Sequence, residues 1–168
     1  MSLVLIACKN NEQAASLKKE KAPKRVENIT ETQHKDTLKV SLLEIKKKLK
    51  AQGYKTFEYI DESTKDTVLM QQYFMVFLKR GPIRDQNEEE LTKLEEMHFK
   101  HLKRMYNEGF VDISGPFDDD SDIRGITIYN VPTSKMADSL AHLDPMVKTG
   151  RLIVEVHPWW VRKGASLR

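Results

Sequence analysis

Tyr73-Phe74-Met75-Val76-Phe77-Leu78 is a run of apolar and aromatic side chains with no polar interruption. Such a run is typical of a strand that is buried on both faces. The strand is expected over residues 72–79, because Arg80-Gly81-Pro82 follows and ends it. The run therefore predicts a central strand, on which the rest of a core must pack.

A helix is predicted over residues 88–108. Glutamates fill its first turn, where the helix dipole favours negative charge, and Gly109 provides a stop. The apolar residues recur at the spacing of one helical stripe. They are Leu91, Leu94, Leu102 and Met105. His98 and His101 lie seven residues after Leu91 and Leu94, which places both histidines on or beside this stripe.

The elements that follow complete a recognisable order. Strands are predicted over 110–114, 125–131 and 151–156, and a short helix with Thr133 or Ser134 as its cap lies between the last two. The resulting order is strand, helix, strand, strand, helix, strand. This is the ferredoxin-like split βαβ arrangement of the α+β class, a four-stranded antiparallel sheet with two helices on one face. Its other face is too apolar to meet water, so we expect a homodimer through the open sheet face.

The N-terminal segment differs in character. Residues 1–8 contain Leu5-Ile6-Ala7-Cys8, which resembles the lipobox of bacterial lipoproteins, although no basic segment precedes it and the apolar run is short. This resemblance implies lipidation of Cys8, a membrane tether and a place at the cell envelope, on the periplasmic side. The alternative is an accidental apolar start, with a buried or free Cys8 in a cytoplasmic protein.

The remaining segments divide by composition. Residues 9–37 are polar and are expected to form a disordered tether. Residues 38–66 are expected to form a helix ended by Gly53 and a strand over 54–60, which pairs with the next strand as a hairpin. Residues 67–164 form the main domain, and 165–168 a tail.

Composition excludes several functions. The net charge is +3, and residues 67–168 carry 14 Lys and Arg against 15 Asp and Glu, so no basic face for nucleic acid is expected. Cys8 is the only cysteine, which excludes an intrachain disulfide and a cysteine-based metal site. The sequence lacks a glycine-rich phosphate loop, a Ser-His-Asp signature and a dinucleotide fingerprint. We therefore expect neither a cofactor nor a metal.

Several short motifs together resemble the YCII-related (YciI-like) family of the dimeric α+β barrel superfamily. The resemblance covers residues 73–164 and implies the ferredoxin-like fold and the dimer. Ser121 is a departure, because relatives often have glycine at this position. The motifs, in family order after the opening strand, are His98 before Gly109, Gly115-Pro116-Phe117, Asp119-Asp120, Arg124-Gly125, Asp144-Pro145 and His157-Pro158-Trp159.

The resemblance also implies a His–Asp site, formed here by His98 with Asp119 or Asp120. A histidine on a packed helix face is partly desolvated, which favours its neutral form, and a nearby carboxylate can fix its tautomer. The free ring nitrogen could then act as a general base in a lyase or isomerase that acts on a small organic acid. The alternative is a core histidine in a non-catalytic module for ligand binding or assembly, and the sequence does not decide whether the protein is an enzyme.

Three further residues are candidates for substrate binding. His101 lies on the same helix, although a structural role in the core fits it as well. Asp144 precedes a proline and equally suits a helix cap or turn. Trp159 could stack on a ligand or pack at a dimer edge.

Overall fold

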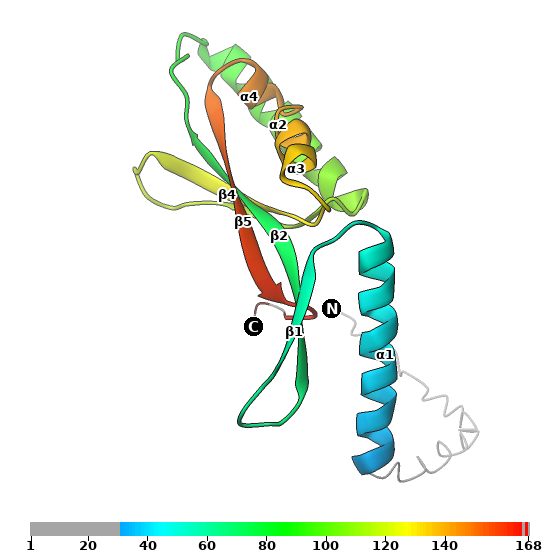
Figure 1. The fold of residues 1–168 in the computed structure, drawn as a ribbon. Helices are drawn as coiled ribbons and strands as arrows, with labels where there is room; N and C mark the ends of the chain where they lie inside the picture. Colours follow the sequence, from blue (N-terminus) through cyan, green and yellow to red (C-terminus); the bar gives the residue numbers. More distant parts are fainter. Residues whose placement is uncertain (1–30, 166, 168) are drawn as a thin grey trace, which may run out of the picture.

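The computed structural model describes residues 31–165 and 167 and shows an antiparallel sheet with helices on one face (Figure 1). The fold is therefore α+β, as predicted. In chain order its elements are α1 (Glu31–Ala51), β1 (Thr56–Ile60), β2 (Thr67–Arg80), α2 (Glu88–Asn107), β3 (Val111–Pro116), β4 (Ile123–Tyr129), α3 (Ser134–Ala141), α4 (Pro145–Lys148) and β5 (Leu152–Arg162).

β2 is the centre of the sheet. β5 pairs with it in antiparallel fashion along most of its length, from Met70 to Arg80, and β4 pairs with its other edge from Phe74 to Lys79. β3 pairs with the far edge of β4, which gives the strand order β5-β2-β4-β3. This order confirms the ferredoxin-like prediction. β1 adds a fifth strand, because it pairs with Thr67–Gln71 of β2 as the predicted hairpin.

The core lies between β2 and the helices. Side chains alternate between the two faces of a strand, and Phe74, Val76 and Leu78 all lie on the helix side. Leu94 and Met105 of α2 cover them, with the short helices α3 and α4 beside α2 (Figure 1). The predicted helical stripe is thus the surface by which α2 packs on the sheet.

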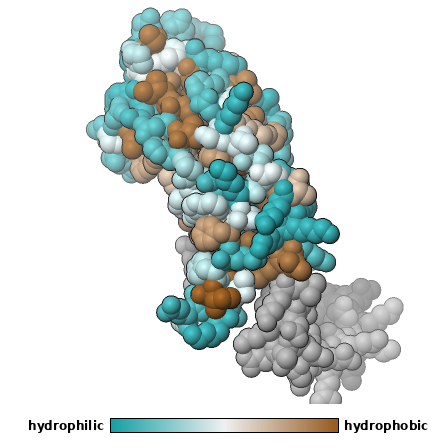
Figure 2. All heavy atoms as spheres, viewed as in Figure 1, coloured by the Kyte–Doolittle hydropathy of each residue, from teal (hydrophilic) through white to brown (hydrophobic). Residues whose placement is uncertain are grey.

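The opposite face of the sheet carries no helix from the main domain (Figure 1). Met75 and Phe77 of β2 lie on it half-buried, and neighbouring strands add the more exposed Ile113, Ile153 and Trp159. From the side shown in Figure 2, which is that of Figure 1, hydrophobic residues form separate patches among hydrophilic ones.

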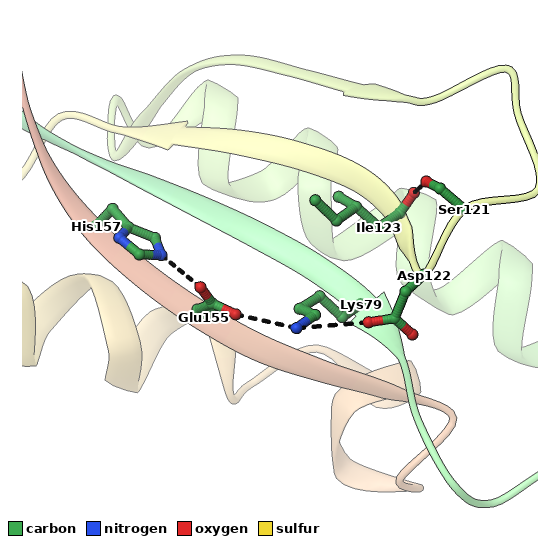
Figure 3. A network of polar contacts seen from close by, with 6 residues as sticks. All are labelled: Lys79, Ser121, Asp122, Ile123, Glu155 and His157. Carbon is green, nitrogen blue, oxygen red and sulfur yellow. Dashed lines mark hydrogen bonds and ion pairs between the residues drawn. The ribbon is translucent and has the colours of Figure 1, made fainter.

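A polar network interrupts this apolar face (Figure 3). Lys79 Nζ donates to Glu155 Oε2 at 3.2 Å and lies 3.5 Å from Asp122 Oδ2, while His157 Nε2 lies 2.7 Å from Glu155 Oε1. The hydrogen bond from His157, followed by that from Lys79, lowers the pKa of Glu155. The face therefore combines apolar side chains with a strip of opposite charges.

The structure corrects the boundary of the predicted tether. α1 begins at Glu31, whereas the tether was predicted to extend to residue 37 and the helix to begin at residue 38. Lysine, glutamate and glutamine are good helix formers. A segment with few apolar residues can therefore still extend a helix whose C-terminal part packs on the rest of the protein. Leu49 near the C-terminal end of α1 is buried, and Gly53, at φ +83°, follows as the predicted stop.

The last strand is longer than predicted. β5 continues through His157-Pro158-Trp159-Trp160 to Arg162, although the sequence suggested an end near residue 156. A proline is tolerated there because β5 is an edge strand, with β2 as its partner, and need not donate a hydrogen bond outward. Trp160 packs edge-on against Phe57 of β1, with ring centroids 4.8 Å apart.

Two further expectations concern the membrane and the N-terminus. None of the helices that the structure describes combines the length and apolar character needed to cross a membrane. Cys8 and most of the predicted tether lie outside the described residues.

Candidate active site

α2 is held in a defined position by its start and its buried stripe. Asn87 and Glu90 form a capping box, in which the Asn87 side chain accepts from the Glu90 N–H and the Glu90 carboxylate accepts from the Asn87 N–H. Leu94 is buried in the core. His98 follows Leu94 by one helical turn, so its ring lies on the same side of α2, where only 12% of the side chain is exposed.

Asp144 meets His98 from the opposite side. It is the N-cap of α4, where its Oδ1 accepts the Met146 N–H at 2.9 Å. Its Oδ2 lies 2.6 Å from His98 Nδ1. The carboxylate is only 2% exposed, and each of its oxygens has a donor. A buried carboxylate needs such partners, because desolvation without compensation would be costly.

This contact determines which ring nitrogen of His98 carries the proton when the ring is neutral. A carboxylate only accepts hydrogen bonds, so Nδ1 of His98 must donate its proton to Asp144. In the neutral ring Nε2 then has a free lone pair. The pair consequently has the geometry of a general base with an orienting acid.

His98 forms part of the wall of a cavity of about 580 Å³. The cavity lies between α2 and the strands β2, β3 and β4, with the loop that follows β2 and the start of β5 at its border. Its size suits a small organic ligand. Apolar residues supply much of the remaining wall, among them Leu78, Phe99, Leu102, Ile126 and Met146.

Four arginines also line this cavity, and none of them was among the site residues predicted from the sequence. They are Arg80, Arg84, Arg124 and Arg151. The topology explains their meeting, because the end of one antiparallel strand lies beside the start of its neighbours. Arg80 ends β2, while Arg124 and Arg151 lie at the starts of β4 and β5. An arginine at each of these strand ends was the signal available in the sequence.

The predicted partners of His98 are not the ones the structure shows. Because Nδ1 contacts Asp144, the prediction that Asp119 or Asp120 orients His98 is wrong. Asp119 is exposed and accepts the N–H of Ser121 in its own hairpin loop, and hydrogen bonds from Ser121 lower its pKa. Asp120 does line the cavity. The side chain of Asp119 thus turns back on its own loop, as in Asx-type turns.

The other candidates divide between core and surface. His101 is buried on α2 and is not among the cavity residues. Burial lowers its pKa, against a smaller opposing effect of the Asp144 charge, and its Nε2 has no hydrogen-bond partner among the described residues. Trp159 lies on the helix-free face, paired with Tyr73 and away from the cavity. Asp144 is thus the member of the predicted binding set that lies at the site.

The described part of the chain contains no group of three or more His, Cys, Asp or Glu side chains that could hold a metal ion.

Fold and site together define a ferredoxin-like α+β protein with a buried His–Asp pair beside a ligand-sized cavity. The model of the YCII-related domain matches residues 73–160, more than half of the chain, and includes both members of the pair. The chain therefore belongs to the YCII-related family, which confirms the resemblance drawn from the sequence.

The remaining comparisons concern curated proteins and solved structures. No curated protein matched it. Among solved structures, it is similar to 5-chloro-2-hydroxyhydroquinone dehydrochlorinase (TftG) from Burkholderia phenoliruptrix AC1100, solved in complex with 2,5-dihydroxybenzoquinone. The identity is 20% and the TM-score 0.39, over 52% of this chain and 92% of that one.

Proposed function

We propose that the cavity is the active site of a small-molecule lyase or isomerase in which His98 is the general base and Asp144 positions it. The observation that supports this most is the 2.6 Å contact between His98 Nδ1 and a carboxylate that is almost fully buried. That contact leaves Nε2 as the acceptor of the neutral ring, and His98 lies on the wall of a cavity large enough for a substrate.

The proposed reaction begins with transfer of a proton from an acidic C–H of the substrate to His98 Nε2. The electron pair of the C–H bond stays on the substrate as an enolate or carbanion. Asp144 stabilises the imidazolium that forms, as a carboxylate does in other His–Asp pairs. Return of the proton to another atom completes an isomerisation, whereas departure of a leaving group with its electron pair completes an elimination.

Hydrogen exchange tests this proposal without knowledge of the final product. The protein is incubated in D₂O with a panel of small organic acids that have an acidic C–H, and loss of that proton signal is followed by NMR. We expect exchange with the unmodified protein and none with His98→Gln. His142→Gln is the matched control, because His142 is exposed on the end of α3. Retained exchange in His98→Gln, with folding unchanged, would contradict the proposal.

The alternative is a non-catalytic module for ligand binding or assembly at the cell envelope. It predicts that His98→Gln lowers the melting temperature while no acid in the panel is exchanged or turned over. The proposed anchor has its own test, in which a radioactive fatty acid should label the full-length protein in bacteria but not its Cys8→Ser variant. Equal labelling of the two would exclude lipidation at Cys8.

We further propose that two copies associate through the helix-free sheet face. The support is the exposure there of Ile113, Ile153 and Trp159, each about 40% or more exposed. Light scattering should give the mass of a dimer, and Ile113→Arg should reduce it to that of a monomer. Leu43→Arg, at a residue 67% exposed on α1, is the control and should stay dimeric. A monomeric unmodified protein at all concentrations would exclude this interface.

A further inference from the structure

The cavity beside His98 carries more positive charge than its surroundings neutralise. Four arginines line it, Arg80, Arg84, Arg124 and Arg151, against two acidic residues, Glu95 and Asp120. Each arginine is charged at any physiological pH. No arginine of this group takes part in the ion pairs formed between described residues.

The hydrogen bonds of these arginines do not compensate their charge. Arg80 and Arg124 donate to carbonyls of the β3–β4 loop, and Arg151 donates to a side-chain amide at 2.9 Å. Arg84 has no hydrogen bond to a described residue. The acceptors are all neutral, namely the backbone carbonyls of Asp119, Asp120 and Ser121 and the side-chain oxygen of Gln86.

The arginines are close enough to affect one another. Burial lowers the pKa of Arg84, and the charges of Arg151, Arg80 and Arg124 lower it further, in that order. A group of like charges around one cavity repels itself, and an anion bound among them would offset that repulsion. Guanidinium groups bind carboxylate and phosphate oxygens in pairs, which gives both affinity and orientation.

We propose that the arginine group is the recognition site for a small organic substrate with at least two negative charges, on carboxylate or phosphate groups. The arginines hold the anionic groups, and the acidic C–H lies toward His98 Nε2. This inference rests on the proposed function for the role of His98, whereas anion binding itself does not depend on that role. Positive charge in the same cavity also stabilises the enolate that forms when the proton leaves.

Arg84→Gln is the most direct variant. Arg84 has no hydrogen bond to another described residue, so its replacement removes a charge without breaking a described contact. Arg162→Gln is the matched control, because Arg162 is exposed at the end of β5 and outside the cavity. Equal melting temperatures should show that both variants fold.

Calorimetry with malonate, inorganic phosphate, acetate and the neutral malonamide measures the preference. We expect malonate or phosphate to bind at least tenfold more tightly than acetate and malonamide, and the tighter of the two identifies the recognised group. Arg84→Gln should weaken that binding about tenfold, whereas Arg162→Gln should leave it within about twofold. Added salt should weaken it as well, since the attraction is electrostatic.

Several results would overturn the inference. They are binding of malonate and phosphate no tighter than that of malonamide, equal binding of acetate and malonate, or an equal effect of the two arginine substitutions. His98→Gln separates this inference from the proposed catalysis. Dianion binding that survives in His98→Gln, when the unmodified protein itself shows no hydrogen exchange, would support the arginine site and contradict the general base. Hydrogen exchange confined to uncharged compounds would support the general base and contradict the arginine site.

Discussion

Asp144→Asn forces a choice between the two contacts that the carboxylate makes. Oδ1 accepts the Met146 N–H and Oδ2 accepts the proton of His98 Nδ1, so both oxygens are needed as acceptors. An asparagine has one oxygen and one NH₂ group that only donates. Either the cap of α4 is kept and the NH₂ faces His98, or the bond to His98 is kept and the NH₂ faces the Met146 N–H.

Each outcome has a defined cost. A hydrogen bond to a buried charged group stabilises a protein by about 1.5–3 kcal/mol, and an N-cap by about 1 kcal/mol. Asp144→Asn replaces hydrogen bonds to a charged group by neutral ones or loses one of them, so the free energy of unfolding should fall by about 1–3 kcal/mol. Asp144→Ala loses both contacts and should cost about 2.5–4 kcal/mol, the sum of the same magnitudes. Because the carboxylate is 2% exposed, solvent screening does not reduce these values.

The tautomer of His98 distinguishes the two arrangements. If the cap is kept, Nδ1 must accept from the new NH₂ group, and the ring proton moves to Nε2. Long-range ¹⁵N–¹H NMR of histidine-labelled protein, recorded at about pH 9, above the usual histidine range, shows which ring nitrogen carries the proton. We expect a protonated Nδ1 in the unmodified protein and a protonated Nε2 in Asp144→Asn, together with loss of hydrogen exchange on bound acids.

Two results would refute this reasoning. An Nε2-protonated ring in the unmodified protein would mean that Asp144 does not fix the tautomer. An Asp144→Asn variant with the stability and tautomer of the parent would mean that the carboxylate does not need both acceptors. His98→Ala supplies the double-mutant cycle, in which the effect of Asp144→Asn should be smaller once the ring is absent.

Three further predictions concern stability. Gly81→Ala should lower the free energy of unfolding in urea by about 3 kcal/mol, because the added Cβ would lie 2.1 Å from the carbonyl oxygen of Gly150, and overpacking of this kind is costly. Gly109→Ala should cost only about 1–2 kcal/mol, since no atom lies within 4 Å of the added Cβ and the penalty comes from φ +76° alone; an equal cost for the two would contradict the steric account. The lowered pKa of His101 means that the folded state binds a proton at His101 less readily than the unfolded chain does. The stabilisation that comes from keeping His101 neutral is therefore fully present above about pH 6.5 and is lost as pH falls toward the lowered value. Urea titrations between about pH 7.5 and pH 5 should show this loss in the parent and a smaller one in His101→Leu, whereas an identical slope would exclude His101 as its source.

The fold was predictable because its signals are local and repeated. The run from Tyr73 to Leu78 and the stripe of α2 each determine an element by periodicity, and element order then permits few topologies. The start of α1 and the end of β5 were less predictable. The first depends on continuation of a helix into a polar segment, and the second on whether Pro158 lies on an edge strand, which is known only once the strand order is known.

The site was predictable in part. The position of His98 on the packed side of α2 follows from its spacing to Leu91, and the carboxylate of Asp144 was recognised as a cap. Its pairing with His98 depends on how α4 packs against α2 in three dimensions, which no local pattern contains. The acidic loop at Asp119 and Asp120 offered the more obvious carboxylates, but it is Asp144 that forms the hydrogen bond with the ring.

The charged groups around the cavity differ in whether a partner compensates their charge, and under the proposed function this difference would orient a ligand. The negative charge of Asp144 is matched by two donors, the His98 ring and the Met146 N–H. The arginines have only neutral acceptors and keep their attraction for an anion. On the proposed function, a substrate with an anionic end would be drawn to the arginines, and its remaining part would extend along the apolar wall that includes Phe99. Because His98 lines that same cavity, the proposed anion binding and the proposed proton transfer would use two sides of one site.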